Sequence, residues 1–180
     1  AADRFIKIYP RHPNIDYAWY IKGLTNYNRG KTIVDKFLPQ DPSERDTATM
    51  RAAYDDFDQL VRSYPNSIYA PDAAQRMIYL RNNMAEYEIH VADYYLRRKA
   101  FVAVANRGEY VIENFQRTPS VPDALIYMVR AYRALELNEL EDDALRVLQL
   151  NYPDRPEIAW LQDPRGFEKA QKKSPFWKFW

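Results

Sequence analysis

The sequence predicts an all-α protein made of antiparallel helix pairs that repeat along the chain. Apolar residues recur every three or four positions over most of residues 1–153, which is the spacing of one face of a helix. Each apolar run also ends at an aromatic residue followed by a polar turn. No convincing alternation of apolar and polar residues predicts a strand. With 180 residues, of which 47% are apolar, the chain can bury a core without disulfides.

Composition excludes several classes of function. The 26 basic and 25 acidic residues give a net charge of +1, so there is no overall basic field for nucleic acid. The four glycines are too scattered for a phosphate-binding loop, and the absence of cysteine excludes a disulfide framework and a thiolate metal site. No apolar run approaches the 18 residues of a membrane-spanning helix. The first residues resemble the middle of a helix, so we expect upstream residues in the intact protein.

Aromatic residues mark the ends of four apolar runs. Each is followed, after a few residues, by a new helical pattern, and three of these patterns open with Asp16, Asp72 or Asp123. An acidic residue in a first helical turn is stabilised by the helix dipole, and proline is tolerated there. The sequence therefore predicts helix starts after Tyr9-Pro10, Tyr64-Pro65 and Phe115-Gln116, while Tyr152-Pro153 closes the last apolar run of the solenoid.

The interval from Pro119 to Pro153 is 34 residues, the period of a tetratricopeptide unit. Such a unit is a helix hairpin that stacks on its neighbours to bury its apolar faces. An earlier helix pair follows the same pattern over residues 17–27 and 53–64, with Ala18 and Gly23 on the packing face. The intervening residues 30–46 are expected to form an ordered loop or a short helical detour.

Residues 72–98 show apolar positions at strict helical spacing, with no glycine or proline after the first turn. They predict one helix of about 27 residues, roughly 40 Å long. Its partner covers residues 101–115, where Gly108 allows close helix approach. We predict two regions: residues 1–153 form a tetratricopeptide solenoid, containing the end of one repeat and three further repeats, and residues 154–180 form an aromatic and basic tail. Docking on the solenoid or capping of its last repeat is the favoured role of this tail, ahead of contact with a membrane surface.

The sequence offers no catalytic, metal-binding or cofactor-binding cluster. His12 is predicted to hydrogen bond to local backbone in its proline-rich turn, and His90 to form an ordinary surface pair with Glu86, four residues earlier. The acidic residues at 139–143 are predicted to stabilise a solvated helix start. We therefore expect no enzyme and no cofactor.

One group of residues suggests binding. Tyr94 and Arg98 lie near the end of the long helix, and Asn106 and Arg107 lie on the next. Tyrosine and arginine are enriched at the centres of protein interfaces. From the residues alone, a core tyrosine with a solvated arginine explains this group equally well.

Several segments closely resemble the BamD family, the tetratricopeptide lipoproteins of the outer-membrane β-barrel assembly machinery. The resemblance covers about residues 1–153, and it is carried by residues 4–17, 22–26, 45–46, 51–53, 60–67, 92–95 and 102–107. It implies that this chain corresponds to the C-terminal part of the family architecture, from the second helix of repeat two to repeat five. The signal peptide and the acylated N-terminal cysteine would precede it.

The resemblance also implies partners and a location. The family's C-terminal repeats bind the periplasmic POTRA domain of BamA and the accessory lipoproteins BamC and BamE, and unfolded outer-membrane proteins bind mainly through the N-terminal repeats that are missing here. The Asn106-Arg107 pair matches the family segment whose arginine meets a BamA carboxylate, with Tyr94 and Arg98 on the neighbouring helix edge. The expected location is the periplasmic face of the outer membrane. The alternative is a periplasmic tetratricopeptide adaptor of cell-envelope synthesis.

Overall fold

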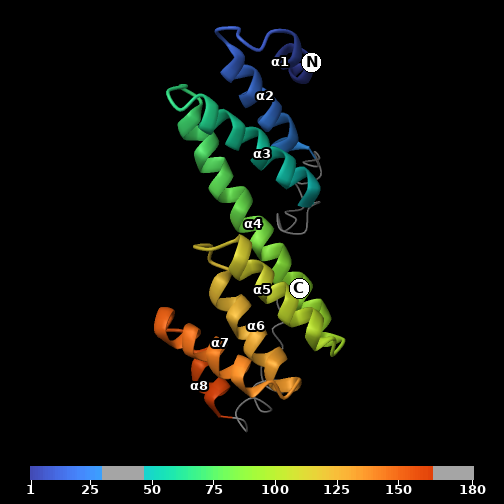
Figure 1. Cartoon of the computed structure of the whole chain (residues 1–180), viewed down its shortest axis with the longest axis vertical. Coiled ribbons are helices and arrows are strands. Elements are labelled where there is room, and N and C mark those ends of the chain that lie inside the picture. Colours follow the sequence, from blue (N-terminus) through green and yellow to red (C-terminus); the bar gives the residue numbers. More distant parts are fainter. Residues whose placement is uncertain (30–46, 164–180) are drawn as a thin grey trace, which may run out of the picture. The chain divides into compact units, whose positions relative to one another are not determined.

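A computed structural model describes residues 1–29 and 47–163 (Figure 1). These residues form eight α-helices, and no strand occurs among them. The chain divides into two compact units, Ala1–Tyr87 and Glu88–Trp180. The prediction of an all-α fold of packed helix pairs is therefore confirmed, and the arrangement is tetratricopeptide-like.

The first unit contains α1 (Ala2–Ile8), α2 (Ile15–Asn28), α3 (Thr47–Ser63) and the beginning of α4 (Ala70–Arg97). Helices α2 and α3 pack against each other. A Cβ atom added at Gly23 would lie 2.5 Å from Cε1 of Phe57, so the ring occupies the space that a larger residue would need. Ala18 is also buried, which confirms the predicted packing face of α2. The predicted insert at 30–46 lies outside the described residues.

The aromatic residues that end the apolar runs also end the helices. Tyr9, Phe115 and Tyr152 are the C-caps of α1, α5 (Phe101–Asn114) and α7 (Asn138–Asn151), and Tyr64 follows the last residue of α3. In each case the aromatic carbonyl accepts a hydrogen bond from the N–H group three residues later, at 3.1 Å in His12, 2.9 Å in Ser67, and 3.2 Å in both Thr118 and Arg155. One type of turn therefore starts α2, α4, α6 (Val121–Ala134) and α8 (Glu157–Gln162).

Helix α4 confirms the long helix predicted at 72–98. It has 28 residues, or about 42 Å at the usual helical rise. In the turn that follows it, Lys99 has a positive φ of 58°, and the N–H of Ala100 bonds to the carbonyl of Tyr95 at 3.0 Å. The turn after α6 repeats this geometry, with Glu136 at φ 59° and a bond from the N–H of Leu137 to the carbonyl of Tyr132. Both α4 and α6 are thus closed by the same left-handed turn before the next helix begins.

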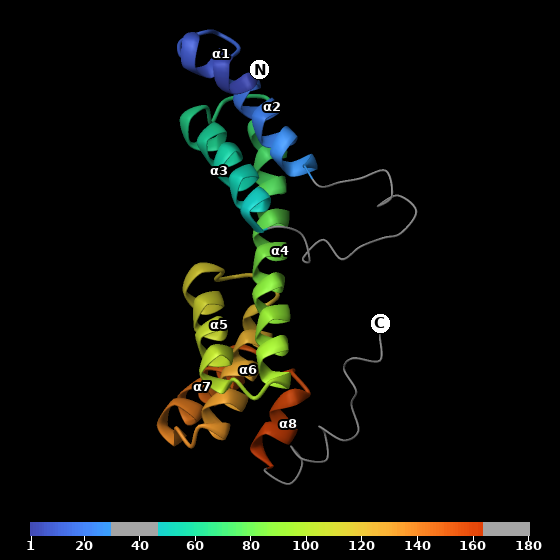
Figure 2. The same ribbon diagram turned by 90° about the vertical axis from the view of Figure 1, so that its right-hand side faces the viewer.

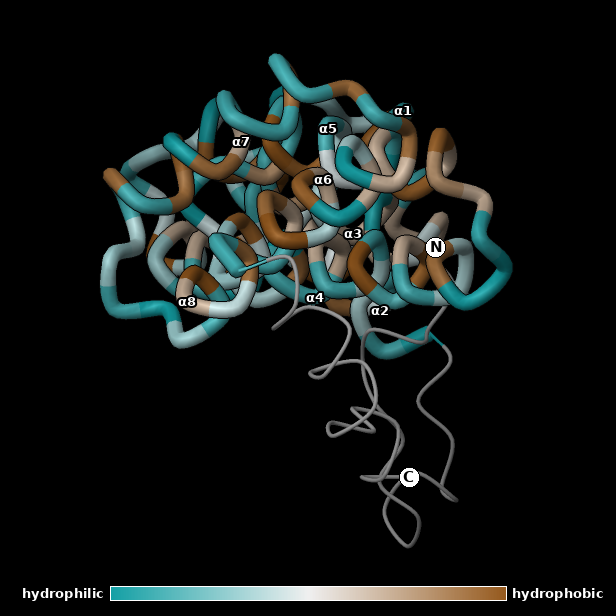
Figure 3. Tube along the Cα trace, turned by 90° about the horizontal axis from the view of Figure 1, so that it is seen from below, coloured by the Kyte–Doolittle hydropathy of each residue, from teal (hydrophilic) through white to brown (hydrophobic). Residues whose placement is uncertain are grey.

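The second unit is built around one hydrophobic cluster. Helices α5, α6 and α7 lie next to one another (Figure 2), and α6 packs against both of the others. The fully buried members of the cluster include Val104, Val129, Leu148 and Leu161. Along these helices hydrophobic segments (brown) alternate with hydrophilic ones (teal), as expected for amphipathic helices (Figure 3).

Leu161 belongs to α8, within the predicted tail. The cluster of the second unit therefore includes side chains beyond the expected boundary at residue 153. The rest of the predicted tail, residues 164–180, lies outside the described residues. The division into a solenoid of 1–153 and a tail of 154–180 stays a prediction.

Candidate protein interface

Arg107 forms an ion pair within its own chain. Its Nη1 donates to Oε2 of Glu88 on α4 at 2.8 Å. The Glu88 side chain is only 10% exposed, whereas that of Arg107 is 39% exposed. The carboxylate is thus nearly covered and the guanidinium reaches the surface. A carboxylate in this position needs a charged partner, because an unpaired buried charge is costly.

The neighbour of Arg107, Gly108, explains which way Arg107 faces. A Cβ atom added at Gly108 would lie 2.4 Å from Cγ of Met128 and 3.0 Å from the carbonyl oxygen of Ala124, both on α6. The predicted close approach at Gly108 is therefore confirmed. Successive residues on a helix are turned by about 100°, so the residue before this contact faces away from α6. Arg107 consequently meets α4, and the preceding Asn106 is exposed.

Tyr94, near the end of α4, and Arg98, in the turn just after it, form a second group. The guanidinium carbon of Arg98 lies 3.7 Å from the centroid of the Tyr94 ring, a cation–π contact, and both residues are exposed. Tyr94 is six residues beyond Glu88, or about 9 Å along the helix axis. The four predicted interface residues therefore lie at two positions along the α4–α5 hairpin. Arg107, beside Asn106, pairs with Glu88 at one position, and Arg98 stacks on Tyr94 at the other.

Sequence reasoning missed a hydrogen bond between a tyrosine on α6 and an aspartate on α4. The Tyr127 hydroxyl on α6 donates to Oδ1 of Asp93 at 3.1 Å, and Arg97 donates to the other oxygen of that carboxylate. Burial raises the pKa of Tyr127, so the hydroxyl stays a donor. The only signal in the sequence was the spacing of Asp93 and Arg97, four residues apart on one helix face.

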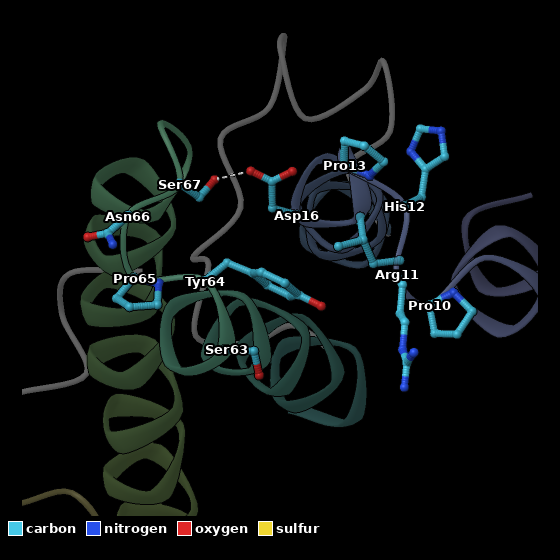
Figure 4. A pocket seen from close by; sticks show the side chains of 11 residues that line it. Pro10, Arg11, His12, Pro13, Asp16, Ser63, Tyr64, Pro65, Asn66 and Ser67 are labelled. Carbon is cyan, nitrogen blue, oxygen red and sulfur yellow. Dashed lines mark hydrogen bonds between the residues drawn. The ribbon is translucent and has the colours of Figure 1, made fainter.

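A groove lies between two neighbouring turns of the first unit (Figure 4). Its volume is about 470 Å³, and it is lined by residues 10–13 and 63–67 with Ile15 and Asp16. The Ser67 hydroxyl donates to Oδ2 of Asp16 at 2.6 Å, which links the two turns. His12 Nδ1 accepts a hydrogen bond from the Asn14 N–H at 3.1 Å, which confirms its predicted local backbone role.

The acidic run at 139–143 is only partly as predicted. Glu139 is exposed in the first turn of α7, where an acidic residue favours the helix dipole. Glu141, however, is mostly covered, and it accepts a hydrogen bond from Nε of Arg133 at 2.7 Å. Arg133 also donates to the carbonyl of Leu161, so Glu141 belongs to a contact among α6, α7 and α8 that the sequence did not reveal.

The described part of the chain holds neither a metal-binding cluster nor a membrane-spanning helix. No group of three histidine, cysteine or acidic side chains within it is placed to hold a metal ion. None of its helices combines the length and hydrophobicity needed to cross a bilayer.

The fold and these surface groups define a tetratricopeptide-like helical-repeat protein with a paired arginine on one helix hairpin. The family model for YfiO, described as an outer membrane lipoprotein, matches residues 1–148. The chain therefore belongs to this family of outer membrane lipoproteins.

Curated relatives of this chain are named outer membrane protein assembly factor BamD. The relative from Neisseria gonorrhoeae is 38% identical over the whole of this chain, which covers 65% of that protein. The relative from Xylella fastidiosa strain Temecula1 is 41% identical over 97% of the chain and 59% of its own length. The relative from Vibrio cholerae is 34% identical over 83% of the chain and 62% of its own length. The chain thus spans less than two thirds of these relatives.

Proposed function

We propose that this chain is part of a non-enzymatic scaffold subunit that assembles β-barrel proteins into the bacterial outer membrane. The observation that carries the proposal is the match to BamD assembly factors along the whole chain. The fold supports it, because stacked helix pairs offer a preformed surface that needs little ordering when a partner binds. The working location is the periplasmic face of the outer membrane, with a lipid anchor on a part of the protein outside this chain.

The proposed contact with the POTRA domain of BamA centres on Arg107 and Asn106. Guanidinium groups bind carboxylates through directed pairs of hydrogen bonds. The ion pair with Glu88 holds Arg107 in position while part of its side chain stays exposed. A partner carboxylate would then meet an arginine whose rotamer is already fixed, which lowers the entropy cost of binding.

Tyr94 and Arg98 supply a second proposed contact on the same hairpin. Tyr94 is half exposed, and the guanidinium of Arg98 is stacked on its ring. Such a pair combines apolar area with hydrogen-bond donors, the composition typical of interface centres. The accessory lipoproteins BamC and BamE are further proposed partners. Unfolded barrel proteins are proposed to bind mainly through repeats that lie outside this chain.

The central test is a charge exchange at the ion pair. Arg107→Glu alone places two carboxylates together and disturbs the α4–α5 hairpin. Arg107→Glu with Glu88→Arg restores the internal pair but leaves a carboxylate at position 107. Both variants should bind a BamA POTRA fragment about 30-fold or more weaker than wild type, since losing a paired charge at an interface costs about 2 kcal/mol or more. The dissociation constants are measured by titrating each variant over a surface that carries the immobilised POTRA fragment.

Arg62→Glu is the matched control, because Arg62 is an exposed arginine on α3 whose charge is reversed in the same way. It should bind the POTRA fragment as wild type does. Unchanged affinity of the folded double variant would contradict the assignment of Arg107. Failure of wild type to bind any POTRA fragment would contradict the scaffold role itself and favour an adaptor of cell-envelope synthesis.

A further inference from the structure

Helix α7 presents an apolar stripe to solvent that nothing in the described residues covers. Leu140, Val147 and Leu150 follow one another at spacings of seven and three residues, so they share one face of the helix. Leu150 is 75% exposed and Val147 is 44% exposed. The adjoining face, with Ala144 and Leu148, is buried. Exposed apolar stripes of this kind commonly mark interaction sites.

The stripe is bordered by acidic side chains. Glu139, Asp142 and Asp143 are all exposed on α7, and the helix contains only one basic residue, Arg146, which pairs with Asp143. A segment that covers this face should therefore combine apolar side chains with positive charge.

Residues 164–180 of the same chain have this composition. They contain five basic residues and one acidic residue, together with Phe167, Phe176, Trp177, Phe179 and Trp180. Four of these five aromatic residues fall within the last five positions, next to Lys178. Like the α7 face, the segment is rich in apolar side chains, and its net charge is opposite to that of the acidic residues beside the stripe.

The segment is also long enough to span this face from the point where the described residues stop. Helix α8 packs on α6 and α7, and Arg133 holds the carbonyl of Leu161. The 17 residues that follow Asp163 can span up to about 56 Å, whereas α7 is about 21 Å long. Binding within one chain also gains from a high effective concentration.

We propose that the aromatic and basic segment 164–180 docks on the exposed face of α7 in its own chain, with aromatic rings on Leu140, Val147 and Leu150. Docking covers a stripe that would otherwise promote self-association.

Single cysteines test this proposal, because these 180 residues contain none. Val147→Cys in the full chain should react with a maleimide several-fold more slowly than the same variant that also carries Trp177→Ser and Trp180→Ser. The matched control is Val102→Cys on α5, an exposed valine of the same unit that is 60% exposed. Its reaction rate should be unaffected by the tryptophan substitutions.

A second measurement uses disulfide formation. The pair Val147→Cys with Trp177→Cys should form an intramolecular disulfide at least 10-fold faster than the pair Val102→Cys with Trp177→Cys, at a rate independent of protein concentration. Equal rates for the two pairs, or a Val147→Cys reactivity that ignores the tryptophan substitutions, would overturn the proposal. If the slow maleimide reaction of Val147→Cys became fast on dilution, a second copy of the chain would be covering the face. That result would also overturn the proposal.

Discussion

The Tyr20 hydroxyl donates a hydrogen bond to Oδ2 of Asp72 at 2.7 Å and so ties α2 to the beginning of α4. Arg76 donates to the same carboxylate through Nε at 2.6 Å. The group of Tyr127, Asp93 and Arg97 repeats this arrangement near the end of α4. Each compact unit therefore fixes its part of α4 with one tyrosine, one aspartate and the arginine four residues after that aspartate.

The two tyrosine contacts should contribute similarly to stability. Tyr20→Phe and Tyr127→Phe each remove one hydrogen bond to a charged acceptor while keeping the ring. We expect each to lower the free energy of unfolding by about 1–2 kcal/mol, measured by urea denaturation. Tyr94→Phe is the control, because the Tyr94 ring is half exposed and its contact with Arg98 does not use the hydroxyl. A change below 0.3 kcal/mol (about half of RT) in both test variants would contradict the structural role.

Asp72 should make stability depend on acidic pH. The hydrogen bond from Arg76, together with that from Tyr20, holds the pKa of Asp72 below its usual value of 3.8 despite partial burial. Its contribution is therefore complete above pH 3.8 and is lost as pH falls through the lower folded-state pKa. Asp72→Asn should be less stable than wild type at pH 7, and this difference should shrink as pH falls below 3.8. Urea denaturation at pH 7, 5, 4 and 3 measures it. A difference independent of pH would show that the carboxylate charge contributes nothing.

The ion pair between Arg107 and Glu88 should respond asymmetrically to substitution. Arg107→Met leaves a nearly buried carboxylate without this partner, so we expect a loss of about 2 kcal/mol. Glu88→Gln leaves a guanidinium that is partly exposed to water and should cost about 1 kcal/mol or less. Chemical denaturation of both variants at pH 7 tests the order. A larger loss of stability in Glu88→Gln than in Arg107→Met would contradict the view that the buried Glu88 carboxylate is the group that needs its charged partner.

Gly108 should tolerate no side chain while Met128 is present. Gly108→Ala places a methyl group 2.4 Å from Cγ of Met128, so overpacking should cost about 1–3 kcal/mol even though alanine favours a helix. The carbonyl of Ala124, at 3.0 Å, limits how far the helix can adjust. Met128→Ala in the same chain should remove most of the penalty, and the coupling between the two changes is read from a double-mutant cycle. Additive effects would contradict the packing of α5 on α6 at this position.

The sequence by itself determined the helices and where they stop. The period of apolar residues predicted α4 to within two residues, and the aromatic residues at 9, 64, 115 and 152 marked helix ends, because both signals depend on local backbone geometry. Gly23 and Gly108 likewise predicted close packing, since a missing side chain is visible in the sequence. The role of His12 followed from its turn alone.

Only the tertiary structure decided which polar groups meet. Arg107 and Glu88 are 19 residues apart, Tyr20 and Asp72 are 52 apart, and nothing in the local spacing joins them. Helix periodicity gives the face of a residue on its own helix but not the register of that helix against the next, which depends on how core side chains such as Met128 interlock. The pairing of Arg107 inside its own chain, and the incorporation of Leu161 into the core of the second unit, therefore came from packing alone.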